Sequence, residues 1–170
     1  VWDVTLHVDG QIEHWAPGQF ARLHVGDDAW RDYSIAGLDD HRLRLLISTR
    51  TGGQGSQFIE NADEGATTVV ELPLGGFGLA DSDRRRLFIA TGTGIAPMLA
   101  MFAQAPGLEH DTLVFGCRNR EEDLTTVIDS PMPGRVLRCL SREEAPRAFH
   151  GRVTDALPGL ADSSGLDPRS

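Results

Sequence analysis

Glycines at positions 92 and 94 stand between an apolar run at 87–90 and a segment with helical periodicity. Glycine lets a backbone approach a ligand closely. A helix that begins after such a turn presents unpaired N–H groups and the positive end of its dipole. Pro97 suits the first helical turn, where a missing N–H costs nothing. The spacing therefore predicts a strand–turn–helix unit whose glycine turn and helix N-terminus suit a phosphate.

Two further clusters have side chains or amides suited to an anion or a flat ring. Arg31 and Tyr33 alternate along a predicted strand and would share one face, with Ser34 turned to the other. A guanidinium beside an aromatic ring suits a phosphate and a planar cofactor, and an exposed cross-strand pair has the same pattern. Residues 52–56 (Gly-Gly-Gln-Gly-Ser) lead into a predicted helix, where successive amides could hold a pyrophosphate or form only a flexible loop.

Composition excludes several classes of function. The 170 residues carry a net charge of −9, which argues against a binder of nucleic acid or of anionic membranes. All basic residues are Arg, so anion recognition must come from guanidinium groups and backbone amides. No apolar run reaches the length of a membrane span, and two cysteines give no disulfide framework. We expect a cytoplasmic protein in a reducing compartment.

Hydrophobic patterning changes near residue 82. Residues 1–82 carry short alternating runs between turn dipeptides, which predicts an all-β antiparallel barrel. Its expected strands cover residues 1–8, 19–25, 30–36, 42–47 and 67–72, with one helix at 56–62. Residues 83–170 alternate strands with helices, which predicts an α/β nucleotide-binding domain with a parallel sheet. Its expected strands are 87–90, 112–115 and 135–140, and its expected helices are 95–104, 121–128 and 151–157.

The order of four motifs gives the strongest indication of function. Arg-x-Tyr-Ser at 31–34, Gly-x-Gly-Ser at 53–56, Gly-x-Phe-x-Leu at 75–79 and Gly-Thr-Gly-Ile-Ala-Pro at 92–97 follow one another. This ordered set, spanning roughly residues 1–157, resembles the ferredoxin–NADP reductase family. The resemblance implies a flavin-binding barrel followed by an NAD(P)-binding domain.

The resemblance also implies roles for individual residues. Arg31 would hold the flavin pyrophosphate, Tyr33 would stack on the isoalloxazine, and Ser34 would lie near its reactive nitrogen, which makes Tyr33 and Ser34 the expected catalytic positions. The flavin phosphate turn would comprise Gly53, Gln54, Gly55 and Ser56. The nicotinamide dinucleotide pyrophosphate would lie at Thr91, Gly92, Thr93 and Gly94. The extra ribose phosphate of NADP would be surrounded by Arg118, Ser141, Arg142 and Arg152.

Such a protein would transfer hydride between NAD(P)H and FAD and pass electrons to a ferredoxin or an oxygenase component. Three arginines favour NADP over NAD, and FMN stays open as the flavin because no adenine-stacking aromatic follows Ser34. Six scattered histidines predict no metal site, and the carboxylate pairs Glu121-Glu122 and Glu143-Glu144 are expected to be solvated. The family continues with a further strand, so the α/β domain is expected to be incomplete at its C-terminus. The alternative is a non-catalytic module that binds flavin or partner proteins without nicotinamide hydride transfer.

Overall fold

A computed structural model describes residues 1–10, 12, 14–80 and 84–164 of the chain. Its packing divides the chain into two compact units. Unit 1 comprises residues 1–82 and 93–105, and unit 2 comprises residues 83–92 and 106–170.

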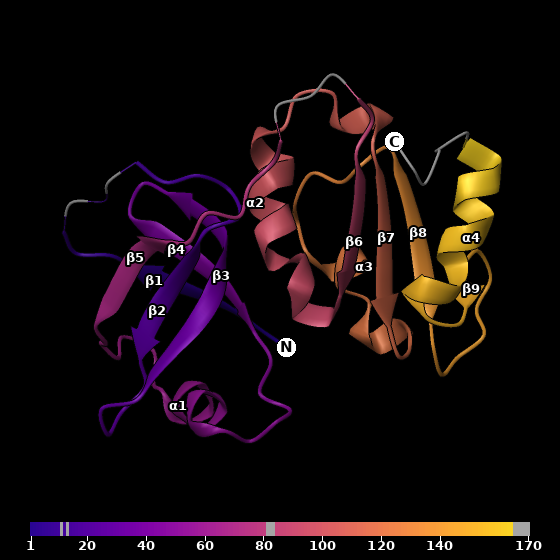
Figure 1. Cartoon of the computed structure of the whole chain (residues 1–170). Helices are drawn as coiled ribbons and strands as arrows, with labels where there is room; N and C mark the ends of the chain where they lie inside the picture. The colour runs from indigo at the N-terminus through magenta and orange to yellow at the C-terminus, as the bar shows by residue number, and fades with distance from the viewer. Residues whose placement is uncertain (11, 13, 81–83, 165–170) are drawn as a thin grey trace. The chain divides into compact units, whose positions relative to one another are not determined.

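Unit 1 contains a five-stranded antiparallel sheet in the order β1-β4-β3-β2-β5 (Figure 1). Its strands are β1 (Trp2–His7), β2 (Phe20–His24), β3 (Trp30–Asp39), β4 (Arg42–Ile47) and β5 (Val70–Leu74). Helix α1 (Gln54–Asn61) follows β4, and helix α2 (Ala96–Gln104) packs on β3. The predicted all-β antiparallel first domain is confirmed.

The core of unit 1 follows from the alternation of apolar residues along these strands. Ala21 and Leu23 of β2 are fully buried, and so are Leu43 and Leu45 of β4. Residues two apart on a strand point to the same face, so these pairs form one continuous apolar layer. Ile59 of α1 joins that layer and fixes the helix against the sheet.

Unit 2 contains a four-stranded parallel sheet in the order β6-β7-β8-β9 (Figure 1). Its strands are β6 (Leu87–Thr91), β7 (Thr112–Cys117), β8 (Arg135–Leu140) and β9 (Phe149–His150). Helix α4 (Val153–Ser164) covers one face, where Ala156 and Leu160 pack on Val114 and Cys139. Near-continuous burial along β7 is typical of a parallel strand with both faces covered. The predicted parallel α/β sheet is confirmed.

Two predicted helices of this region differ in detail from the structure, and one strand was not predicted. The helix expected at 121–128 is a 3₁₀ turn, η3 (Arg120–Glu122), followed by a short α3 (Leu124–Val127). Asp123 separates the two because its extended backbone and its side chain cap α3 by accepting a hydrogen bond from the Thr125 N–H at 3.0 Å. The helix expected from residue 151 begins at Val153, since Gly151 has a φ of +143°. Strand β9 was not predicted, because two residues carry no periodicity.

Two 3₁₀ turns complete the described elements. η1 (Gly92–Ile95) joins β6 to α2, and η2 (Leu108–His110) precedes β7. Within the described residues, every helix is too short or too polar to cross a bilayer.

Candidate functional site

The first candidate site lies where β3 of unit 1 meets the beginning of α1. One Arg31 Nη group donates a hydrogen bond of 2.7 Å to Oε1 of Gln54, and the other donates one of 2.7 Å to the carbonyl of Trp30. These bonds hold an exposed guanidinium beside the first turn of α1. Residues 30–31 and 54 are far apart in sequence, so the fold has brought the two predicted clusters together.

Gly55 allows this close approach. A Cβ built on Gly55 would overlap the hydroxyl of Tyr33 and lie 3.3 Å from Cγ of Arg31. Arg31 and Tyr33 therefore share the face of β3 that meets α1, as their spacing predicts. Tyr33 is half-buried, and this burial raises the pKa of its hydroxyl, opposed by the charge of Arg31.

The first turn of α1 presents backbone rather than side chains. Gly53 precedes the helix, and a Cβ on it would meet no atom within 4 Å, so its backbone is open to a ligand. The N–H groups of a first helical turn lack intrahelical acceptors. Ser56 is 5% exposed, with its Oγ 3.5 Å from Oγ1 of Thr51, so its backbone is better placed than its hydroxyl to contact an anion.

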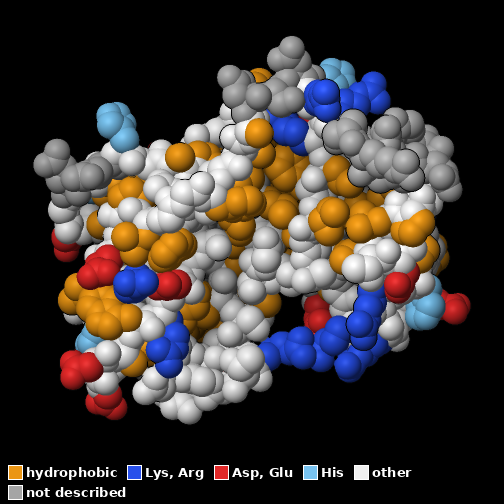
Figure 2. All heavy atoms as spheres, viewed as in Figure 1, with side chains coloured by type: hydrophobic (Ala, Val, Ile, Leu, Met, Phe, Trp, Pro, Cys, Tyr) orange, Lys and Arg blue, Asp and Glu red, His pale blue; other side chains and the backbone are white. Residues whose placement is uncertain are grey.

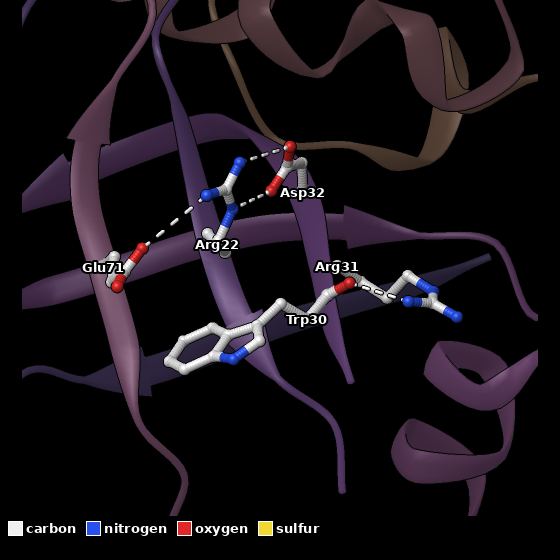
Figure 3. Close-up of a pocket in the computed structure, with 5 residues that line it drawn as sticks. All are labelled: Arg22, Trp30, Arg31, Asp32 and Glu71. Atoms are coloured by element: carbon white, nitrogen blue, oxygen red, sulfur yellow. Dashed lines mark hydrogen bonds and ion pairs between the residues drawn. The ribbon is translucent and has the colours of Figure 1, made fainter. Parts of the chain in front are cut away.

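Ion pairs connect β2 with its neighbouring strands β3 and β5. Arg22 of β2 donates from Nε to Asp32 at 2.7 Å and lies 3.9 Å from Glu71 of β5. With Trp30 and Arg31 these residues line an open hollow of about 500 Å³ (Figure 3). Its charges largely satisfy one another, and hydrogen bonding to Arg22 holds the pKa of Asp32 below its usual range.

The second candidate site lies at the carboxyl ends of the parallel strands of unit 2. Hydrogen bonds join the loops beyond these ends: Ser141 N–H to Cys117 O at 3.1 Å, and Arg142 N–H to Arg118 O at 2.9 Å. The Gly151 N–H donates to Leu140 O at 2.9 Å, which places Arg152 in the next loop along. Ligands of open α/β sheets bind at this edge.

The glycine turn of the sequence begins at the same edge. A Cβ on Gly116 would lie 2.7 Å from Cγ1 of Val153 and 3.1 Å from Cγ2 of Thr91, so the end of β6 adjoins the start of α4. Gly92, with φ of +50°, and Gly94 both have open space where a Cβ would be. Thr91 and Gly92 belong to unit 2, whereas Thr93 and Gly94 belong to unit 1.

The three predicted phosphate arginines differ in their partners. Arg118 forms a two-pronged ion pair with Glu122, with Nε 2.9 Å from Oε2 and an Nη group on Oε1. This hydrogen bonding raises the pKa of Arg118. Arg142 and Arg152 are exposed, and the described part of the chain records no ion pair for either guanidinium. Basic side chains gather at the end of the sheet where these strands finish (Figure 2).

Cys117 is the last residue of β7 and lies at the start of the same loop. Its Sγ donates a hydrogen bond of 3.3 Å to the carbonyl of Asn119. Burial, with the nearby carboxylates of Asp123 and Glu122, raises the pKa of the thiol to about 11.

We therefore expect iodoacetamide to modify Cys117 about 100-fold more slowly at pH 8 than it modifies an ordinary thiol, because only the thiolate reacts. The rate should climb about tenfold for each pH unit up to about 11. Peptide mapping by mass spectrometry separates Cys117 from the buried Cys139. A rate that reaches its plateau near pH 9 would show that the carboxylates and burial have no such effect.

Comparison with known proteins relates this arrangement to a group of enzymes. No protein-family model matches the chain. Over 129 residues it is 37% identical to the anthranilate 1,2-dioxygenase electron transfer component of Acinetobacter baylyi, a match that covers 72% of this chain and 37% of that protein. Over 157 residues it is 36% identical to methane monooxygenase component C of Methylosinus trichosporium, covering 85% and 46%.

Solved structures agree with these sequence matches. The Amycolatopsis cytochrome P450 reductase GcoB superposes with a TM-score of 0.71 at 27% identity, covering 89% of this chain and 50% of that one. The chain is a homologue of the ferredoxin–NADP reductase-like flavin reductases. It spans half or less of the length of these three relatives.

As a homologue of flavin reductases, the chain can be tested for its fit to a flavin phosphate. The residues fit: Gly55 leaves the space that lets α1 approach Tyr33, and Gly53 leaves its amide open beside the Arg31 guanidinium. An arginine fork and free amides are the donors that a pyrophosphate requires.

The sequence analysis did not identify the acidic partners of the arginines in the second candidate site. Of the four carboxylates expected to be solvated, Glu121 and Glu144 are exposed, whereas Glu122 and Glu143 are only partly exposed and form ion pairs. Glu122 is paired with Arg118, and Glu143 accepts hydrogen bonds from the backbone N–H of Arg120 at 2.9 Å and from its Nε at 2.5 Å. These bonds, the backbone one first, hold the pKa of Glu143 below its usual range. The i,i+4 spacing of Arg118 and Glu122 could have indicated the first pair.

Proposed function

We propose that the chain is the reductase portion of a flavoprotein oxidoreductase that transfers hydride between NAD(P)H and flavin. The convergence of Arg31, Tyr33 and the first turn of α1 on one face of unit 1 is the observation that carries the proposal. FAD is the proposed flavin, with FMN as the alternative, and NADP or NAD is the proposed substrate. The electrons would pass to a ferredoxin-like or oxygenase partner, since two relatives are named as components of a dioxygenase and a monooxygenase.

In unit 1 the protein would bind and orient the flavin. A bound flavin supplies the exchange between two-electron and one-electron chemistry. Arg31 and the amides of Gly53, Gln54, Gly55 and Ser56 would hold its phosphates, because charge-assisted bonds to phosphate are short and strong. Tyr33 would stack on the ring system. Ser34, half-buried on β3 opposite Phe20, is proposed to lie near the reactive nitrogen.

In unit 2 the carboxyl ends of the strands would bind the dinucleotide. Thr91 and Gly92, followed by Thr93 and Gly94, are proposed to receive its pyrophosphate. Ser141 with Arg118, Arg142 and Arg152 is proposed to surround a 2′-phosphate. A dianion beside several guanidinium groups gains charge-assisted, two-pronged hydrogen bonds.

The test is to reconstitute the chain with FAD and to follow oxidation of NADPH and NADH with ferricyanide as the acceptor. We expect a yellow protein that oxidises both nucleotides. A chain that takes up flavin but oxidises neither nucleotide would be a non-catalytic flavin module. A chain that takes up no flavin would contradict the proposal altogether.

A glycine substitution tests only the proposed flavin site of unit 1. Gly55→Ala is expected to weaken FAD binding about tenfold, because the added methyl group must displace the Tyr33 ring or the start of α1. Isothermal titration with FAD measures the effect. The matched control is Gly159→Ala in α4, where a Cβ meets no atom within 4 Å. Equal affinities for the two variants would show that the flavin does not depend on this contact.

A further inference from the structure

The loop after β7 contains a carboxylate that competes for a predicted phosphate ligand. Glu122 engages Arg118 through both carboxylate oxygens. The pair is only partly exposed, at 33% for the Arg118 side chain and 29% for that of Glu122. Arg118 is therefore held in a fixed geometry by a charge of opposite sign within its own loop.

The loop that carries this ion pair is hydrogen-bonded to two of the other predicted phosphate ligands, Ser141 and Arg142. The carbonyl of Arg118 accepts a hydrogen bond from the N–H of Arg142 at 2.9 Å. The neighbouring Ser141 donates two hydrogen bonds to the carbonyl of Cys117, one from its backbone N–H at 3.1 Å and one from its hydroxyl at 3.4 Å. The loop with Arg118 and Glu122 is thus joined to the loop with Ser141 and Arg142 by backbone hydrogen bonds.

We propose that Glu122 is a specificity-determining residue that weakens binding of nucleotides carrying a 2′-phosphate by holding Arg118 in an ion pair. The inference rests on the proposed nucleotide site of unit 2. To bind the phosphate, Arg118 must give up Glu122 or share its donors with it, and the dianion is repelled by the remaining carboxylate. A ribose that carries only hydroxyl groups has no net charge and meets neither cost. Glu122 therefore lowers the affinity for NADP relative to that for NAD.

The neighbouring residue provides a matched control. Glu121 is exposed, carries the same charge in the same turn, and has no recorded ion pair among the residues that the structure describes. Glu121→Gln changes the net charge of the loop as Glu122→Gln does, without releasing Arg118. A difference between the two variants measures the ion pair rather than the general charge.

The experiment is isothermal titration of the full chain with AMP and with 2′-phospho-AMP, which needs neither flavin nor turnover. We expect Glu122→Gln to tighten 2′-phospho-AMP binding about fivefold and to change AMP binding less than about twofold. Glu121→Gln should change both by less than about twofold. In an Arg118→Ala background, Glu122→Gln should lose most of its effect, because the pair is then already broken.

Two results would overturn this inference while leaving the proposed nucleotide site in place. One is binding of both nucleotides with equal responses to Glu122→Gln and Glu121→Gln. The other is an effect of Glu122→Gln that persists in full without Arg118. Absence of binding for both nucleotides would overturn the proposed nucleotide site, and the inference with it. Binding of AMP also shows that each variant is folded.

Discussion

Arg31→Ala is expected to weaken FAD binding by about 100-fold. The substitution removes a guanidinium that the structure holds beside the first turn of α1 through a 2.7 Å bond to Gln54. A charge-assisted hydrogen bond contributes about 1.5–3 kcal/mol, and an arginine can make two to one phosphate. The measurement is titration of the chain with FAD, with binding monitored through the quenching of flavin fluorescence.

Arg22→Ala is the control for this variant. It removes the same charge from the adjacent strand β2, where the Arg22 guanidinium is already paired with Asp32 and lies near Glu71 (Figure 3). We expect its FAD affinity to stay within about threefold of the unmodified chain. An Arg31→Ala variant that binds FAD as tightly as Arg22→Ala would contradict the assignment of Arg31.

Asp111→Ala is expected to lower the free energy of unfolding by about 3–5 kcal/mol. Asp111 is 2% exposed and accepts hydrogen bonds of 2.8 Å from both the backbone N–H and Nε of Arg86. Its carboxylate also lies 2.6 Å from an Nη group of Arg86. Removing it leaves a mostly buried guanidinium and a backbone donor without their acceptor. Urea unfolding followed by far-ultraviolet circular dichroism measures the loss.

Glu109→Ala provides the comparison for stability. Glu109 lies two residues away, its side chain is 70% exposed, and its carboxylate lies 3.5 Å from Nε2 of His110. Exposed ion pairs contribute little, so the expected change is within about 0.5 kcal/mol. Similar unfolding midpoints for the two variants would show that the buried pair contributes no more than the exposed one.

Much of the fold could be predicted because its strands have clear periodicity. The alternation at residues 42–47 and the apolar run at 112–115 both predict strands that the structure contains, as β4 and β7. The segment at 121–128 was harder, because Asp123 is a helix cap inside an apparently helical pattern. β9 is defined by pairing with β8, which no local pattern shows.

The candidate sites show the same division between local and non-local information. Strand alternation correctly placed Arg31 and Tyr33 on one face, and the glycines at 53 and 55 marked the start of a helix. The contact of Gly55 with Tyr33 depends on how α1 packs, which the sequence does not show. The pairing of Arg120 with Glu143 joins loops after different strands, so no spacing along the chain could reveal it. The boundary expected at residue 82 and the roles assigned to the site residues stay predictions.

The most direct test of the account is rapid anaerobic mixing of the FAD-reconstituted chain with NADPH and, separately, with NADH. The account predicts loss of the visible flavin absorbance with both nucleotides, because it assigns a flavin site and a nucleotide site to the same chain. Flavin that binds firmly and keeps its absorbance after mixing with either nucleotide would contradict it.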